Sequence, residues 1–150
     1  MDQYSQIANW YDMLYHKGCP EDLEEIDNAL SHIKSGKILE IGCGTGRVLY
    51  HLLKQGFEII GVDNSRRMLE IAKNKVDKLD ALTPKNARFI HGCFPEIQLQ
   101  SSFDAIIAPF NVLNEVIHEY QLYQILLRIF EYLSVGGSFV AHIVYSPQNG

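Results

Sequence analysis

The residues best suited to chemistry form a glycine-rich stretch, Gly42 to Gly46, that joins a short apolar run to a helical pattern. A glycine loop at such a junction lets a ligand approach the backbone, and it commonly holds part of a nucleotide. The dinucleotide pattern G-x-G-x-x-G is only partly met, because Arg47 stands where the third glycine belongs. The bulk of this arginine argues against a pyrophosphate. No P-loop lysine follows, which argues against a nucleoside triphosphate.

Two acids, one just before this loop and one at the end of the next apolar run, could contact the same ligand. Glu40 lies two residues before Gly42, where a carboxylate would repel a pyrophosphate and suit a cationic ligand. Asp63 ends the next apolar run, 19 residues after Gly44. At that distance a carboxylate can accept hydrogen bonds from both hydroxyls of a ribose, a charge-assisted contact of about 1.5–3 kcal/mol. The residues therefore favour a ligand with a ribose, a positive charge and no phosphate, and S-adenosylmethionine has all three features.

Short β-rich runs must position these residues. Their near-continuous Ile, Val and Phe content is typical of parallel strands that are covered on both faces. We expect strands at residues 37–41, 58–63, 87–92, 103–108 and 138–145.

Amphipathic helical patterns separate the expected strands. Ser65 is a plausible N-cap for a helix whose apolar face is Met68, Leu69, Ala72, Val76 and Leu79. A second helical face, ahead of Gly136-Gly137, is Leu122, Ile125, Leu126, Ile129 and Leu133. An upstream helical face, leading into the first strand, is Leu23, Ile26, Leu30 and Ile33.

This alternation predicts an α/β fold, a three-layer, doubly wound, Rossmann-like and mostly parallel sheet. Ligands of such sheets bind at the carboxyl ends of the strands, where the strand order reverses, and the glycine loop lies at such an end. We expect one domain over residues 1–150, with residues 1–35 as an N-terminal helical segment packed on it.

Composition narrows the class of protein. The net charge of −5 gives no support for a nucleic-acid partner. The three cysteines, Cys19, Cys43 and Cys93, are too far apart for a disulfide framework or a zinc site, and the histidines show no ligand spacing, so no metal is expected. The chain shows neither a signal peptide nor an apolar run long enough for a membrane helix, which favours a cytoplasmic protein.

Five ordered blocks carry a family resemblance. They are LEIGCGTG, GVDNSRRMLEIAKNKV, FIHGCF, FDAIIAPFNVLNEV and LSVGGSFVAHI, and the N-terminal YSQIANWYDMLY agrees with them. In this order they resemble the motifs of class I S-adenosylmethionine-dependent methyltransferases of the small-molecule type, over nearly the whole chain. The resemblance implies methyl transfer from S-adenosylmethionine, with S-adenosylhomocysteine as the product.

The resemblance also implies roles for residues near the expected cofactor. The backbone of Gly42, Cys43 and Gly44 would face its methionine part, and Glu40 would act on its charged end through water. Asp63 would hold the ribose, with Asn64 beside it. Further contacts would come from Met68 and Phe94 to the adenine, the Ala108 carbonyl to the ammonium, and Tyr11 to the carboxylate. Met68 and Tyr11 are equally well explained as packing residues.

One position departs from the family pattern. The family often has Gly-Asp after the third strand, where the carboxylate accepts from the adenine amino group, but this chain has Gly92-Cys93. A thiol is a weak acceptor, so we expect that contact to be reduced.

Methyl transfer needs alignment rather than a dedicated acid, and it needs a base only for a protonated acceptor. No catalytic residue is assigned on this basis. Residues that could lie beside the acceptor are Asn111, Asn114 and His118, although a histidine in the first turn of a helix is more often a surface residue.

The family sheet usually has two more strands, which form a hairpin beside strand five. This sequence ends directly after strand five, so we expect the usual last two strands to be lacking and the edge of strand five to be exposed. That edge suggests a homodimer or a shortened form of a longer enzyme. Two other interpretations stay open: a cofactor-binding domain that is inactive or needs a partner, and a nicotinamide-dependent oxidoreductase supported only by Gly42 and Gly44.

Overall fold

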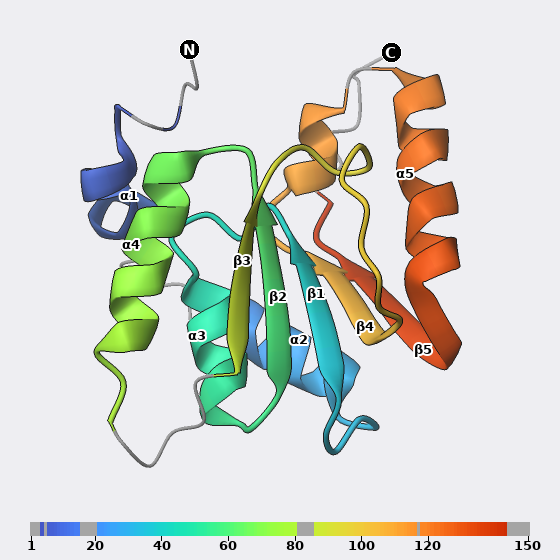
Figure 1. Ribbon diagram of the computed structural model, residues 1–150, viewed down its shortest axis with the longest axis horizontal. Helices are drawn as coiled ribbons and strands as arrows, with labels where there is room; N and C mark the ends of the chain where they lie inside the picture. The colour runs from blue at the N-terminus through green and yellow to red at the C-terminus, as the bar shows by residue number, and fades with distance from the viewer. Residues whose placement is uncertain (1–3, 5, 16–20, 81–85, 117, 144–150) are drawn as a thin grey trace.

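The computed structural model describes residues 4, 6–15, 21–80, 86–116 and 118–143, which form a sheet flanked by helices (Figure 1). Two helices, α1 (Ala8–Tyr15) and α2 (Glu21–Leu30), precede the first strand. The remaining elements, in chain order, are β1 (Lys37–Ile41), α3 (Arg47–Lys54), β2 (Glu58–Asp63), α4 (Arg66–Asp77), β3 (Ala87–His91), β4 (Phe103–Ala108), the 3-10 turn η1 (Val112–Glu115), α5 (Glu119–Tyr132) and β5 (Leu133–Ala141). None of the described helices is long and apolar enough to cross a membrane.

The five strands are parallel and lie in the order β3-β2-β1-β4-β5. The order reverses between β1 and β4, so the carboxyl ends of these two strands form the switch point of the sheet. The glycine loop leaves β1 at this point, as predicted. The predicted parallel, Rossmann-like sheet is confirmed, and β1, β2 and β4 have the predicted bounds.

Helices α2, α3 and α4 pack on one face of the sheet, whereas η1 and α5 pack on the other (Figure 1). Alternate residues of one strand enter opposite cores, since Ile38 of β1 joins the first core and Leu39 the second. This two-sided burial explains why the strands are nearly continuous apolar runs. Ser65 caps α4 as predicted, because its side chain accepts a hydrogen bond from the Met68 N–H.

Several sequence predictions are wrong in detail. Strand β3 ends at His91, one residue before the predicted end, and β5 ends at Ala141, before His142 and Ile143 of the predicted strand. Strand β5 begins at Leu133, five residues before the predicted start, because Leu133 already pairs with Phe103 and an irregularity that contains Gly136 (φ +81°) is absorbed within the strand. The rotation of α5 also differs. It buries Ile125, Ile129 and Tyr132, whereas Leu122 and Leu126 of the predicted face are exposed. Residues 144 and 145 of the predicted strand lie outside the described residues.

Candidate functional site

A cavity of about 660 Å³ opens at the carboxyl ends of β1, β2 and β3 and extends to η1 and α5. This volume is within the usual range for a small-molecule or cofactor site. Its lining includes eight residues expected from the sequence to bind cofactor: Tyr11, Gly42, Gly44, Asp63, Asn64, Met68, Cys93 and Phe94. The structure therefore brings most of the predicted site together from four separate segments of the chain.

Asp63 ends β2 and is fixed by backbone donors on both sides. The Gly44 N–H donates to Oδ2 at 2.8 Å, and the Ser65 N–H donates to Oδ1 at 2.8 Å. A carboxylate accepts hydrogen bonds on both of its oxygens, and these two backbone donors fix the orientation of the group. The arrangement presents a fixed acidic acceptor on the cavity wall beside the glycine loop.

Within the glycine loop, alternate residues face different surroundings. Gly44 has φ +52° and lines the cavity, and an added Cβ there would meet no atom within 4 Å, so its backbone is open to a ligand. Cys43, in contrast, points into the protein, where its Sγ lies against Gly61. Burial raises the pKa of the Cys43 thiol well above its usual value, and the acids Glu40 and Asp63 add to this effect, so the thiol stays protonated. A side-chain contact from Cys43 to a ligand is therefore not supported.

Beside Asp63, the ends of β2 and β3 also bring two large apolar side chains to the cavity wall. Met68 is buried in the first turn of α4 and lines the cavity, and Phe94 lines it from the segment that follows β3. The Phe94 ring lies 6.4 Å from the ring of Tyr132 on α5, which backs it. Cys93 is exposed at the same place. Met68 and Phe94 can thus provide the two apolar surfaces that a flat ring needs.

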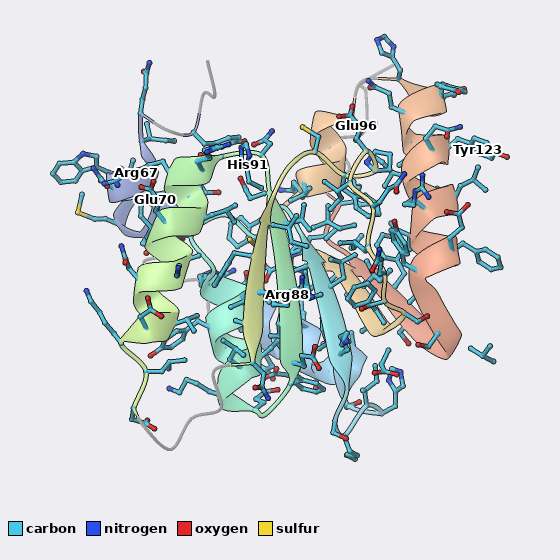
Figure 2. All side chains as sticks on the ribbon, in the orientation of Figure 1. Arg67, Glu70, Arg88, His91, Glu96 and Tyr123 are labelled. Carbon is cyan, nitrogen blue, oxygen red and sulfur yellow. The ribbon has the colours of Figure 1, made fainter. Side chains whose placement is uncertain are left out.

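Helix α1 is held against the cavity by polar contacts. Tyr4 and Tyr11 line the cavity, with ring centroids 6.2 Å apart in an edge-to-face arrangement. Asp12 accepts a hydrogen bond from Thr45 Oγ1 and forms an ion pair with Lys75 of α4. On the side of α4 that faces α1, where Figure 2 labels Arg67 and Glu70, Arg67 bonds both Glu70 (2.9 Å) and Asn9 of α1 (2.8 Å).

Glu40 lies behind the glycine loop and does not line the cavity. Its side chain is fully buried in β1, and its Oε2 has no hydrogen-bond partner among the described residues. Burial raises the pKa of Glu40 from 4.5 to about 8. The Arg47 charge and a backbone hydrogen bond from Leu49, in the first turn of α3, act in the opposite direction, while the Asp63 charge adds to the rise.

The other expected residues lie elsewhere. The Ala108 carbonyl accepts a hydrogen bond from the His142 N–H at 3.1 Å, which turns it toward β5, so the expectation that it binds a ligand ammonium is not supported. Asn111, Asn114 and His118 are not part of the cavity lining. His118 is instead the exposed N-cap residue of α5.

Sequence reasoning missed the wall formed by α5. Gln121, Gln124 and Arg128 line the cavity from one side of this helix, and Glu96, labelled in Figure 2, lines it from the segment after β3. The spacing of the three α5 residues, at i, i+3 and i+7, is a helical face that the apolar pattern hides. The tilt of α5 toward the sheet, which decides whether this face meets a cavity, is not encoded in that spacing.

A parallel sheet with a glycine loop at its switch point and an acid at the end of the neighbouring strand is typical of the class of Rossmann-like nucleotide-binding proteins. Residues 38–137 match the family model described as "Methyltransferase domain", so the chain belongs to this methyltransferase family. This confirms the resemblance drawn from the sequence motifs. A protein of Geobacillus sp. (strain WCH70) that carries a methyltransferase name is 32% identical over 149 residues, which are 95% of this chain and 58% of the relative.

Solved structures agree with this assignment. The CcbJ methyltransferase from Streptomyces caelestis is 28% identical, with a TM-score of 0.79 over 90% of this chain and 54% of that one. S-adenosylmethionine-bound CalS10 from Micromonospora echinaspora, an amino pentose methyltransferase, is 20% identical and shares the fold, with a TM-score of 0.76 over 92% of this chain and 57% of that one. The chain thus spans a little over half the length of these proteins.

Proposed function

We propose that this chain binds S-adenosylmethionine in the cavity and transfers its methyl group to a small-molecule acceptor by in-line displacement. The observation that carries the proposal is the Asp63 carboxylate, oriented by the Gly44 and Ser65 N–H groups on the cavity wall. The family membership of the chain and its similarity to an S-adenosylmethionine-bound methyltransferase support the choice of cofactor.

The residues present fit this cofactor. Asp63 would accept from the ribose hydroxyls, and the open Gly44 backbone would allow the close approach of the methionine part. Met68 and Phe94 would cover the two faces of the adenine. No lysine lines the cavity within the described part of the chain, and its one arginine is on α5, away from the glycine loop, so a pyrophosphate lacks a cation there.

The bound cofactor supplies an electrophilic methyl group on a positively charged sulfur, with a neutral leaving group. The work left to the protein is mostly alignment, which can contribute about 7–11 kcal/mol to the rate. Tyr4 and Tyr11 on one side, and Phe110 and Val112 on the other, would exclude water and hold donor and acceptor in one orientation. The cavity volume and the small-molecule substrate named for CalS10 support a small acceptor.

Calorimetric titration with S-adenosylmethionine, S-adenosylhomocysteine and NADH tests the proposal. We expect micromolar binding of the two adenosyl ligands and weaker binding of NADH. Asp63→Ala should weaken S-adenosylhomocysteine roughly 10–150-fold, because it removes a charge-assisted contact of about 1.5–3 kcal/mol.

Asp104→Asn is the matched control. Asp104 also accepts a backbone hydrogen bond, from the Lys37 N–H at 2.8 Å. It lies near the amino-terminal ends of β1 and β4, whereas the cavity is at the carboxyl ends of the strands. Affinity in this control should stay within about twofold of the parent chain. Preferential binding of NADH would overturn the proposal in favour of an oxidoreductase. Adenosyl binding without turnover of any acceptor would leave a cofactor-binding domain that is inactive or needs a partner.

A further inference from the structure

Arg47, which stands in the place of the third glycine, does not face the cavity. Its guanidinium forms an ion pair with Asp22 of α2, with Nη1 3.0 Å from Oδ1 and Nη2 bonded to Oδ2. Both side chains are largely buried, with 15% and 12% of their surface exposed. A bidentate arginine–carboxylate pair fixes the plane of the guanidinium, so Arg47 is rigidly placed between α3 and α2.

The same guanidinium lies over an aromatic ring. Its Cζ is 4.7 Å from the ring centroid of Phe110, within the range of a cation–π contact. Phe110 follows β4 and lines the cavity. Asp22, Arg47 and Phe110 therefore form a continuous stack from helix α2 to the cavity wall.

The segment that carries Phe110 has a strained backbone. Phe110 and Asn111 have φ values of +55° and +58°, in the left-handed region that non-glycine residues rarely adopt. Such conformations persist when the surroundings over-determine them, and they are concentrated at functional sites. The next residue, Val112, packs so closely on the glycine loop that a Cβ on Gly42 would lie 2.6 Å from its Cγ2. The segment is thus confined by Gly42 on one side and by Arg47 on another.

We infer that Arg47 is a positioning residue, which holds Phe110 in the conformation that shapes the cofactor cavity at the end of β4. The inference rests on the proposed function, because the cavity is the one assigned to S-adenosylmethionine. Arg47 acts through Phe110 and touches no ligand itself. It accounts for the departure from the dinucleotide pattern, since the side chain that replaces the third glycine stabilises a wall of the site.

A double-mutant cycle with S-adenosylhomocysteine as the probe tests the inference. Arg47→Met removes the charge while keeping an unbranched side chain, and it should weaken binding roughly tenfold in the parent chain. In a Phe110→Ala background the same substitution should change affinity by less than about twofold, because the ring that the Arg47 guanidinium contacts has been removed. Arg47→Lys, which keeps the charge but not the bidentate fork, should restore part of the affinity.

Asp27→Asn provides the control for a merely structural effect. Asp27 also joins α2 to α3, through a hydrogen bond to His51 Nε2 at 2.8 Å, but it does not contact Phe110. Asp27→Asn should lower the melting temperature but leave the affinity for S-adenosylhomocysteine unchanged. Equal losses of affinity in Asp27→Asn and Arg47→Met, or a full Arg47→Met effect in the Phe110→Ala background, would overturn the inference. A parent chain that binds no adenosyl ligand would instead refute the proposed function.

Discussion

Replacing Glu40 by glutamine tests the electrostatics of the glycine loop. The Glu40 carboxyl is buried in β1, and its pKa is raised from 4.5 to about 8, mainly by burial. In the unfolded chain the group ionises near its ordinary pKa. Between these two values the folded chain therefore binds one more proton than the unfolded chain, and the free energy of unfolding falls as the pH rises.

The magnitude follows from the two pKa values. At about 1.4 kcal/mol per pH unit, the stabilisation present below pH 4.5 is lost progressively up to about pH 8, a total on the order of 5 kcal/mol. Glutamine has nearly the same shape and no charge at any pH. Relative to the parent chain, Glu40→Gln should change stability little at pH 5 and stabilise the protein by several kcal/mol at pH 9.

Urea denaturation of both chains at pH 5, 7 and 9 is the measurement. The other ionisable groups are the same in both chains, so the difference in stability between variant and parent at each pH is the informative quantity. Glu58→Gln is the control, because Glu58 lies on neighbouring β2, is half exposed and is paired with Lys37 at 3.2 Å. Its effect on the free energy of unfolding should be small at all three pH values. A Glu40→Gln effect that is equally flat would show that Glu40 is ionised throughout, and the argument from burial would fail.

Three further predictions concern the cavity. Cys93→Asp should strengthen S-adenosylhomocysteine binding several-fold in calorimetry, because a carboxylate accepts from an adenine amino group better than a thiol does; unchanged or weaker binding would place the adenine elsewhere. Iodoacetamide should alkylate the exposed Cys93 far faster than the buried Cys43, with protection of Cys93 by S-adenosylhomocysteine, as read by peptide mass spectrometry; equal labelling would contradict the burial of Cys43. Asp12→Ala should accelerate amide hydrogen exchange in α1 at least about tenfold, because it removes the contacts to Thr45 and Lys75; unchanged exchange would mean that apolar contacts hold the helix.

Local pattern predicted most of the fold because each strand is buried on both faces. Near-continuous apolar runs therefore mark β1, β2 and β4 to the residue. The start of β5 was predicted wrongly because Gly136-Gly137 looks like a turn between helix and strand. In the structure the strand begins before these glycines and absorbs them in an irregularity opposite Phe103 and Ala105. Only the partner strand determines this register, and local sequence does not contain it.

The candidate site likewise contains residues that the sequence could place and residues that it could not. Gly44 and Asp63 could be placed from their spacing, since consecutive parallel strands end at the same edge of a sheet, and the structure joins them directly. Glu40 was expected to face the ligand because it is close to the loop in sequence, but the alternation of β1 directs its side chain into the protein. The contributions of Tyr4, Arg128 and Phe110 depend on how α1, α5 and the segment after β4 pack, which no local pattern specifies.

The placement of charges argues for a cationic rather than an anionic ligand. Near the loop, Asp63 presents a carboxylate to the cavity, while Arg47, which directly follows the loop in sequence, is turned away into its pair with Asp22. A pyrophosphate in that position would meet like charge and find no guanidinium to neutralise it. A sulfonium or ammonium in that position would be attracted by the Asp63 carboxylate. If Asp22→Asn releases Arg47 from its partner, the affinity for NADH should rise relative to that for S-adenosylhomocysteine, and competition between the two ligands in one titration measures that ratio directly. A ratio that does not move would mean that the shape of the cavity, rather than its charge, selects the ligand.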